Sequence, residues 1–121
     1  MVRAVTEDPR IFVFGSNLAG RHGKGAALEA AKSYGAIRGQ GWGPQGQSYA
    51  IPTKDFLIKT LPLPMIQYFC RVFVQYARDN PTLTFRLTPI GCDLAGYKPA
   101  QIAPFFNHAP MNVTLPLEFM Y

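Results

Sequence analysis

The sequence predicts an α/β protein, a three-layer α/β/α sandwich around a mainly parallel, partly mixed sheet. Two observations support this fold class. Short apolar segments typical of buried strands alternate along the chain with segments of helical periodicity. Glycine-rich stretches directly follow two of the apolar segments, as loops at the ends of strands do. Alternating strands and helices predict crossover connections and parallel pairing.

Length and composition predict one globular domain over residues 1–121. The chain has 121 residues, of which 48% are hydrophobic and 16% charged, values typical of a folded domain with a single core. Residues 1–10 are polar and aperiodic and form a lead-in segment to this domain.

The first half of the chain predicts two strands and one helix. Residues 11–14 are continuously apolar, which is typical of a strand covered on both faces. Residues 24–33 are rich in alanine and predict a helix, and residues 48–52 predict a second strand. Residues 39–46 contain four glycines and a proline, so we expect a loop there.

The second half predicts two more helices and two more strands. Apolar residues recur every three or four positions over residues 64–79, which indicates an amphipathic helix. Residues 83–89 alternate between apolar and polar and predict a strand. Residues 98–106 predict a helix and residues 111–115 a final strand.

Charge and cysteine content restrict the partners. The net charge of +5 favours anionic ligands, but the basic residues are scattered, so direct nucleic-acid binding has weak support. Two cysteines do not form a disulfide framework, which favours a cytoplasmic protein. No apolar run approaches about 18 residues, so we expect no membrane span. The histidines and cysteines lack ligand spacing, and we expect neither a metal nor a cofactor.

Three predicted strand ends carry unusual residues: 15–25, 53–55 and 91–97. Glycines expose backbone N–H groups, and the helix predicted after the first loop adds its positive end, so a phosphate is a natural ligand there. The first loop lacks the Walker spacing. The letters G-x-G-x-x-G at Gly41–Gly46 lack a preceding strand and a following helix. Two glycine loops at strand ends predict a diphosphate site.

These motifs resemble a known superfamily. Asn17 with residues 20–27, then residues 51–54 and 90–97, resembles the macrodomain superfamily of ADP-ribose binders. The most similar branch contains the terminal ADP-ribose glycohydrolase and the antitoxins that reverse DNA ADP-ribosylation. The chain is also similar to small bacterial and phage proteins, some labelled as phage tail components, through residues 60–63 and 112–116.

The resemblance implies a fold, a ligand and a set of site residues. The fold would be a compact macrodomain, and the partner would be ADP-ribose or an ADP-ribosylated macromolecule. The implied ligand-binding residues come from the strand ends: Asn17, Gly20, Arg21, His22, Gly23, Lys24, Gly25, Thr53, Gly91, Cys92, Leu94, Ala95, Gly96 and Tyr97.

The resemblance also implies hydrolysis of ADP-ribosyl linkages through Lys54. That lysine matches a residue that attacks the anomeric carbon of the distal ribose, and such chemistry requires a lowered lysine pKa. Ala95 stands where those glycohydrolases have their carboxylate. We therefore expect Asp93, or alternatively Asp55, to supply the carboxylate that assists proton transfer.

Other interpretations stay open at this point. The chain could be a non-catalytic structural or phage-associated protein that kept the fold. Cys92 could act as a nucleophile with His22 or His108 as its base. We expect His22 to contact phosphate or solvent, and Trp42 could stack on a base.

Overall fold

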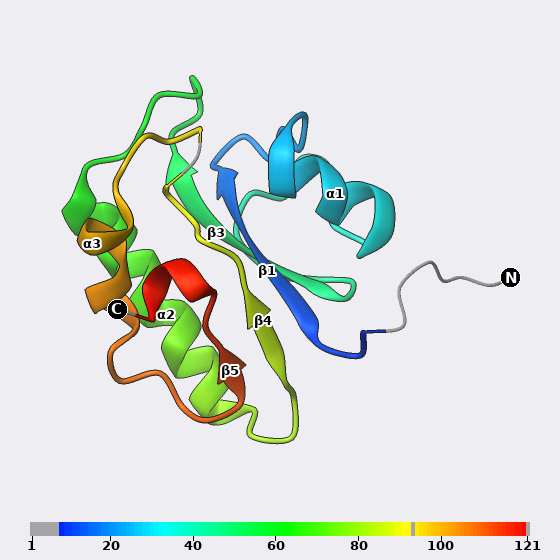
Figure 1. Ribbon diagram of the computed structural model, residues 1–121. Coiled ribbons are helices and arrows are strands. Elements are labelled where there is room, and N and C mark those ends of the chain that lie inside the picture. Colours follow the sequence, from blue (N-terminus) through cyan, green and yellow to red (C-terminus); the bar gives the residue numbers. More distant parts are fainter. Residues whose placement is uncertain (1–7, 93, 121) are drawn as a thin grey trace, which may run out of the picture.

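The computed structural model, which describes residues 8–92 and 94–120, is a mixed α/β structure around a five-stranded sheet (Figure 1). The strands lie in the order β2-β3-β1-β4-β5. Their bounds are β1 Ile11–Asn17, β2 Gly43–Gln45, β3 Ser48–Lys54, β4 Phe85–Leu87 and β5 Val113–Thr114. Strand β1 pairs in parallel with β3 and β4, β5 is parallel to β4, and β2 is antiparallel to β3. The predicted α/β class and mainly parallel, partly mixed sheet are confirmed.

Helices pack on the two faces of this sheet (Figure 1). Their bounds are α1 Gly25–Ser33, α2 Leu63–Asp79 and α3 Pro99–Ile102, and two 3₁₀ helices follow, η1 Ala103–Phe106 and η2 Leu117–Phe119. The single helix predicted over residues 98–106 is therefore divided into α3 and η1. Pro104 lies at the division, where it has no N–H to continue the α-helical hydrogen bonding.

Helices α1 and α2 cover opposite sides of β1, because successive side chains of a strand point to opposite faces. Phe12 and Phe14 pack with α1 and Tyr34 in the smaller apolar cluster. Val13 packs with α2 in the larger cluster, which also contains β3, β4 and the 3₁₀ helices. The glycine loops at the ends of β1 and β4 are held in place by these two cores.

The prediction that residues 39–46 form only a loop is wrong, because β2 lies within this segment. Pro44 pairs opposite Tyr49 of β3, although it cannot donate a ladder hydrogen bond. The sheet tolerates this because β2 is an edge strand, where a missing N–H leaves no neighbour unpaired. The glycines of this segment indicated a loop, and only the pairing with β3 makes it a strand.

The strand lengths also differ from the predictions. The strands predicted over 83–89 and 111–115 shorten to the bounds of β4 and β5. Strands β1 and β3 instead continue to Asn17 and Lys54, which lie opposite one another in the register. This extension brings the end of the first strand beside the predicted nucleophile.

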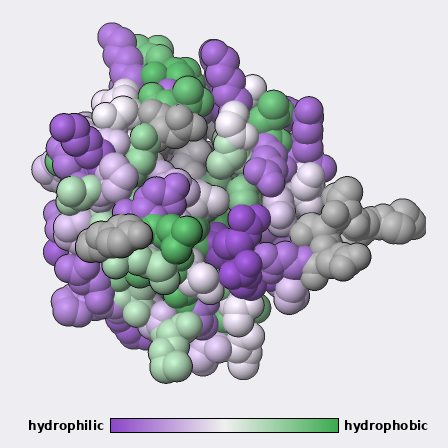
Figure 2. All heavy atoms as spheres, viewed as in Figure 1, coloured by the Kyte–Doolittle hydropathy of each residue, from purple (hydrophilic) through white to green (hydrophobic). Residues whose placement is uncertain are grey.

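The surface is a mosaic of polar and apolar residues, and the face in Figure 2 carries several separate hydrophobic groups between hydrophilic ones. Within residues 8–92 and 94–120, no helix has both the length and the apolar character to cross a bilayer.

Candidate ligand pocket

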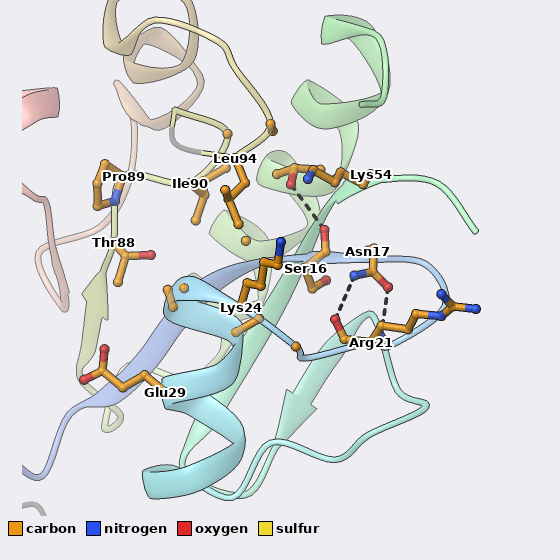
Figure 3. A pocket seen from close by; sticks show the side chains of 18 of the residues that line it. Ser16, Asn17, Arg21, Lys24, Glu29, Lys54, Thr88, Pro89, Ile90 and Leu94 are labelled. Atoms are coloured by element: carbon orange, nitrogen blue, oxygen red, sulfur yellow. Dashed lines mark hydrogen bonds between the residues drawn. The ribbon is translucent and has the colours of Figure 1, made fainter. Parts of the chain in front are cut away.

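A pocket of about 530 Å³ extends along β1, between the start of α1 and the loop after β4 (Figure 3). Its walls come from β1, the first glycine loop, the end of β3 and the second glycine loop. Pockets of this volume accommodate ligands of nucleotide size.

The pocket unites most of the residues that the sequence singled out. Ten of them line it: Asn17, Arg21, Gly23, Lys24, Gly25, Thr53, Lys54, Gly91, Leu94 and Ala95. Five others do not: Gly20, His22, Cys92, Gly96 and Tyr97. Asp93 lies outside the described residues. The two glycine loops thus converge on one cavity, as the strand-end argument requires.

Asn17 holds the first glycine loop together. Its Nδ2 donates to the Arg21 carbonyl, and its Oδ1 accepts from the Arg21 N–H, each at 2.9 Å. The Asn17 side chain is buried, and Gly41 packs directly against its backbone. Both functional groups of the side-chain amide are therefore engaged with the protein, so the residue shapes the pocket wall.

The N-terminus of α1 opens into the pocket. Lys24 is its N-cap residue in extended conformation, and no side chain of the described part of the chain caps the helix. The Leu28 N–H bonds to the Lys24 carbonyl at 3.2 Å, so the preceding N–H groups of Gly25, Ala26 and Ala27 have no partner within the helix. All three residues line the pocket. Unpaired N–H groups and the helix dipole together favour an anion at this end.

The second glycine loop is fixed by its own contacts. Gly91 has a φ of +77°, which side-chain-bearing residues rarely adopt, and an added Cβ would lie 3.1 Å from Ile102. The Tyr97 N–H donates to the Gly91 carbonyl and the Tyr97 hydroxyl to the Leu61 carbonyl, each at 2.8 Å. Tyr97 therefore stabilises the loop without lining the pocket.

Lys54 ends β3 at the rim of the pocket. Its side chain is half-buried, and its carbonyl accepts from the Leu18 N–H at 2.9 Å, which ties the end of β3 to the first loop. Lys24 and Lys54 extend toward the same part of the pocket, near Leu94 (Figure 3).

The pocket is electropositive. Its described lining carries four cations, Arg21, Lys24, Lys54 and Arg86. Glu29 supplies the only carboxylate among the described lining residues. In Figure 3 Glu29 and Lys54 lie at opposite ends of the pocket lining. Clustered cations in a cavity attract an anionic ligand.

Asp55 does not line the pocket. Its Oδ1 accepts from the Leu57 N–H at 2.8 Å and the Lys59 N–H at 2.9 Å, so the carboxylate closes the turn after β3. Glu29 is thus the one carboxylate that the described lining offers as a partner for Lys54 chemistry.

The expectation that His22 contacts phosphate or solvent is wrong. The side chain is fully buried, and its ring lies edge-on to Phe14. Its Nε2 lies 2.9 Å from the Ile37 carbonyl and 3.1 Å from the Gln40 carbonyl, which assigns the ring proton to Nε2. His22 connects the first glycine loop to the segment before β2, and this connection supports the pocket wall.

Cys92 is not suited to act as a nucleophile. It packs against the larger core, and burial, with a smaller effect of Glu118, raises the pKa of the Cys92 thiol to about 11. The thiol is therefore protonated at neutral pH, whereas a nucleophile must be a thiolate. His22, one of the two proposed bases, is fully buried with its Nε2 facing the Ile37 carbonyl, so it does not serve Cys92.

Trp42 and Gly20 contact other parts of the protein, and neither lines the pocket. The Trp42 ring packs edge-on against Phe69 at 4.8 Å and does not line the pocket. A Cβ on Gly20 would lie 2.4 Å from the carbonyl carbon of Gly39, so this position admits only glycine. In the described part of the chain, no group of three or more histidine, cysteine or acidic side chains could hold a metal ion.

Sequence reasoning missed Arg86 and Ile58, both of which line the pocket. The Arg86 guanidinium lies 4.7 Å from the Phe12 ring centroid and donates to the Tyr34 hydroxyl at 3.0 Å. The alternation in residues 83–89 showed that Arg86 lies on the face opposite its apolar neighbours. Its contacts follow only from the register that pairs it with Phe12.

No protein-family model, curated protein or solved structure matches this chain.

Proposed function

We propose that the protein binds ADP-ribose or a related nucleotide diphosphate in this pocket, on a three-layer, macrodomain-like fold. One observation carries the proposal: the open N-terminus of α1 and the Gly91 loop line a single cavity together with Arg21, Lys24 and Lys54. Backbone N–H groups and cations at one point form the preferred environment of a pyrophosphate.

The length of the pocket favours a ligand larger than a single phosphate. The lining reaches from Phe12 to Asn17 along β1, and five steps of a strand span about 16 Å. Lys54 lies opposite Asn17 at one end, whereas Arg86 lies opposite Phe12 at the other. A diphosphate held at the middle, near Gly25, would direct its sugar toward Lys54 and its nucleoside toward Arg86.

On this proposal Lys54 is the reacting group. Its amine nitrogen attacks the anomeric carbon of the distal ribose as the bond from that carbon to the leaving group breaks, and the proton from the attacking nitrogen passes to the leaving group. Water then adds to the anomeric carbon, the carbon–nitrogen bond breaks, and ADP-ribose and the free lysine are released. The half-buried position at the rim supports this role, because the side chain reaches the cavity from a fixed strand end. Without a carboxylate to move the proton, the same pocket would bind ADP-ribose and release it unchanged.

Titration calorimetry tests the binding. ADP-ribose, AMP and NAD are titrated into the protein, into Lys24→Ala and into the matched control Lys32→Ala. Lys32 is exposed on the same helix and does not line the pocket. We expect Lys24→Ala to weaken ADP-ribose binding about tenfold, since a charge-assisted phosphate contact is lost, and Lys32→Ala to bind normally. No heat above background at millimolar ADP-ribose would end the proposal.

Reductive trapping tests the chemistry of Lys54. The ring-opened aldehyde of ADP-ribose condenses with an amine to an imine and water, and cyanoborohydride reduces the imine to a stable secondary amine. Mass spectrometry should locate this adduct at Lys54, and Lys54→Ala should abolish it. Lys59→Ala, which removes an exposed lysine outside the pocket lining, is the control. Binding without an adduct at Lys54 would reduce the function to ligand recognition.

A further inference from the structure

The turn after β3 has an unusual residue at its tightest point. The Ile58 N–H donates to the Asp55 carbonyl at 3.1 Å, and the Asp55 N–H donates to the Lys59 carbonyl at 2.8 Å. These bonds close a three-residue hairpin loop of Phe56, Leu57 and Ile58. In loops of this length the third residue adopts the left-handed conformation and is normally glycine.

Ile58 adopts that conformation with a φ of +64° and is the only described residue other than glycine to have a positive φ. A β-branched residue is among the least suited to this region, because its Cβ substituents crowd the backbone. Glycine at this position would be free of the strain, and asparagine would tolerate the conformation better than isoleucine does. Turn formation alone therefore does not account for an isoleucine here.

Core packing does not account for it either. Ile58 belongs to neither of the two apolar clusters in the described chain, and its side chain is only partly buried. It does line the pocket, at the end where Lys54 lies four residues earlier in the chain. Its neighbours in the turn, Phe56 and Leu57, are exposed by 66% and 76% and do not line the cavity. Strained residues concentrate at ligand sites, where the side chain has a use that offsets the strain.

We propose that Ile58 is a specificity-determining residue that forms an apolar wall at the Lys54 end of the pocket. This inference rests on the proposed function. The wall packs against the terminal sugar and restricts the group on its anomeric carbon. A free sugar or a slim linkage fits, whereas a bulky planar substituent such as the nicotinamide ring of NAD meets the isoleucine side chain. The ligand class is thus narrowed to ADP-ribose and slender ADP-ribosyl linkages.

The hairpin is held rigidly enough to act as a wall. The Thr60 hydroxyl donates to the Ala95 carbonyl at 2.9 Å, which joins the hairpin to the second glycine loop. Thr60 also bridges to Lys54 across the base of the hairpin. Movement of Ile58 out of the pocket would disturb both connections.

The test compares Ile58→Gly and Ile58→Asn with the control Leu57→Gly. Calorimetry gives the dissociation constants for ADP-ribose and NAD, and thermal unfolding gives the melting temperature. The wild-type protein should bind ADP-ribose more tightly than NAD. In both Ile58 variants the dissociation constant for NAD, divided by that for ADP-ribose, should fall about tenfold. A change of this size is usual when a few methyl groups are removed from an apolar pocket. The positive charge of NAD does not confound this comparison, since it is common to all variants.

The melting temperature provides an independent readout. Relief of the backbone strain should leave Ile58→Gly equal to the wild type or up to about 5 °C more stable. Leu57→Gly should leave the ligand ratio unchanged. An unchanged ratio in both Ile58 variants, with ADP-ribose still bound, would overturn the inference and leave the proposed function intact. Absence of ADP-ribose binding by the wild type would overturn both.

Discussion

Asn17 and Arg21 form a closed pair in which the asparagine side chain both donates to and accepts from the arginine backbone, each at 2.9 Å. This pair turns the chain from the end of β1 into the first glycine loop. The pocket-lining groups that follow, from Gly23 to the start of α1, depend on this turn for their position.

Asn17→Ala removes both hydrogen bonds of this pair. We expect the free energy of unfolding to fall by about 1–3 kcal/mol, because the N–H and carbonyl of Arg21 lose their partners in two partly buried hydrogen bonds. ADP-ribose binding should weaken as well, since the loop is no longer held. Urea unfolding and calorimetry measure the two effects. Asn107→Ala, a change at an exposed position, is the control; equal stability of the two variants would contradict this account.

Gly41→Ala should be among the most damaging glycine substitutions. A Cβ at this position would lie 2.0 Å from the carbonyl oxygen of Asn17, which is part of a fixed strand end. Gly23→Ala is the matched control, because apart from the adjoining residues no described atom lies within 4 Å of a Cβ added there. We expect misfolding or a loss of several kcal/mol for Gly41→Ala and a change near zero for Gly23→Ala. Similar melting temperatures for both variants would show that the close approach to Asn17 is wrong.

His22→Ala should lower the free energy of unfolding and leave ADP-ribose binding by the folded protein unaltered. The substitution opens a cavity against Phe14 and removes one donor from each of the carbonyls of Ile37 and Gln40. These carbonyls keep the Gln40 N–H and the Gln45 Nε2 as their other donors, so the cavity accounts for most of the effect. The expected loss is about 2–4 kcal/mol of unfolding free energy. The fraction that stays folded should bind ADP-ribose, because the ring does not line the pocket. Undiminished stability combined with lost binding would restore His22 to the ligand contacts.

The ion pair between Asp8 and Arg10 lies just before β1, and we expect its contribution to the stability of the fold to depend on pH. The hydrogen bonds from Arg10, side chain first, lower the pKa of the Asp8 carboxyl from 3.8 to about 2. Because the folded-state pKa is depressed, the pair stabilises the fold above the ordinary value and loses this effect as the pH falls toward 2. A carboxyl-detected NMR titration of Asp8 measures the pKa.

Arg10→Gln should return the Asp8 pKa toward 3.8, since the largest cause of the shift is removed. Arg71→Gln, at an exposed position on α2, should leave it at about 2. A titration with the same midpoint in both variants would assign the shift to another group.

The sequence was sufficient for the order of β1, α1, β3, α2, β4, α3 and β5 and for the convergence of the glycine loops, whereas β2 was missed. The continuous apolar run at β1 predicted a strand buried in a parallel sheet, and parallel strands bring their carboxyl ends to one edge of the sheet. Gly25 and Gly91, distant in the sequence, therefore meet at one pocket by topology alone.

Side-chain direction and backbone conformation could not be predicted in the same way. His22 lies between residues that look solvent-exposed, and only the fold turns its ring inward. Pro44 obscured β2, because an edge strand is defined by the strand it pairs with. The left-handed conformation of Ile58 leaves no mark in the sequence, where isoleucine indicates a strand.

On the proposed function, both glycine loops bind one shared pyrophosphate. Amide chemical shifts of ¹⁵N-labelled protein, followed as ADP-ribose is added, test it most directly. The account predicts that the amides of Gly25 to Ala27 and of Gly91 shift together with one saturation curve. Shifts confined to one loop, or no shifts at millimolar ADP-ribose, would contradict it.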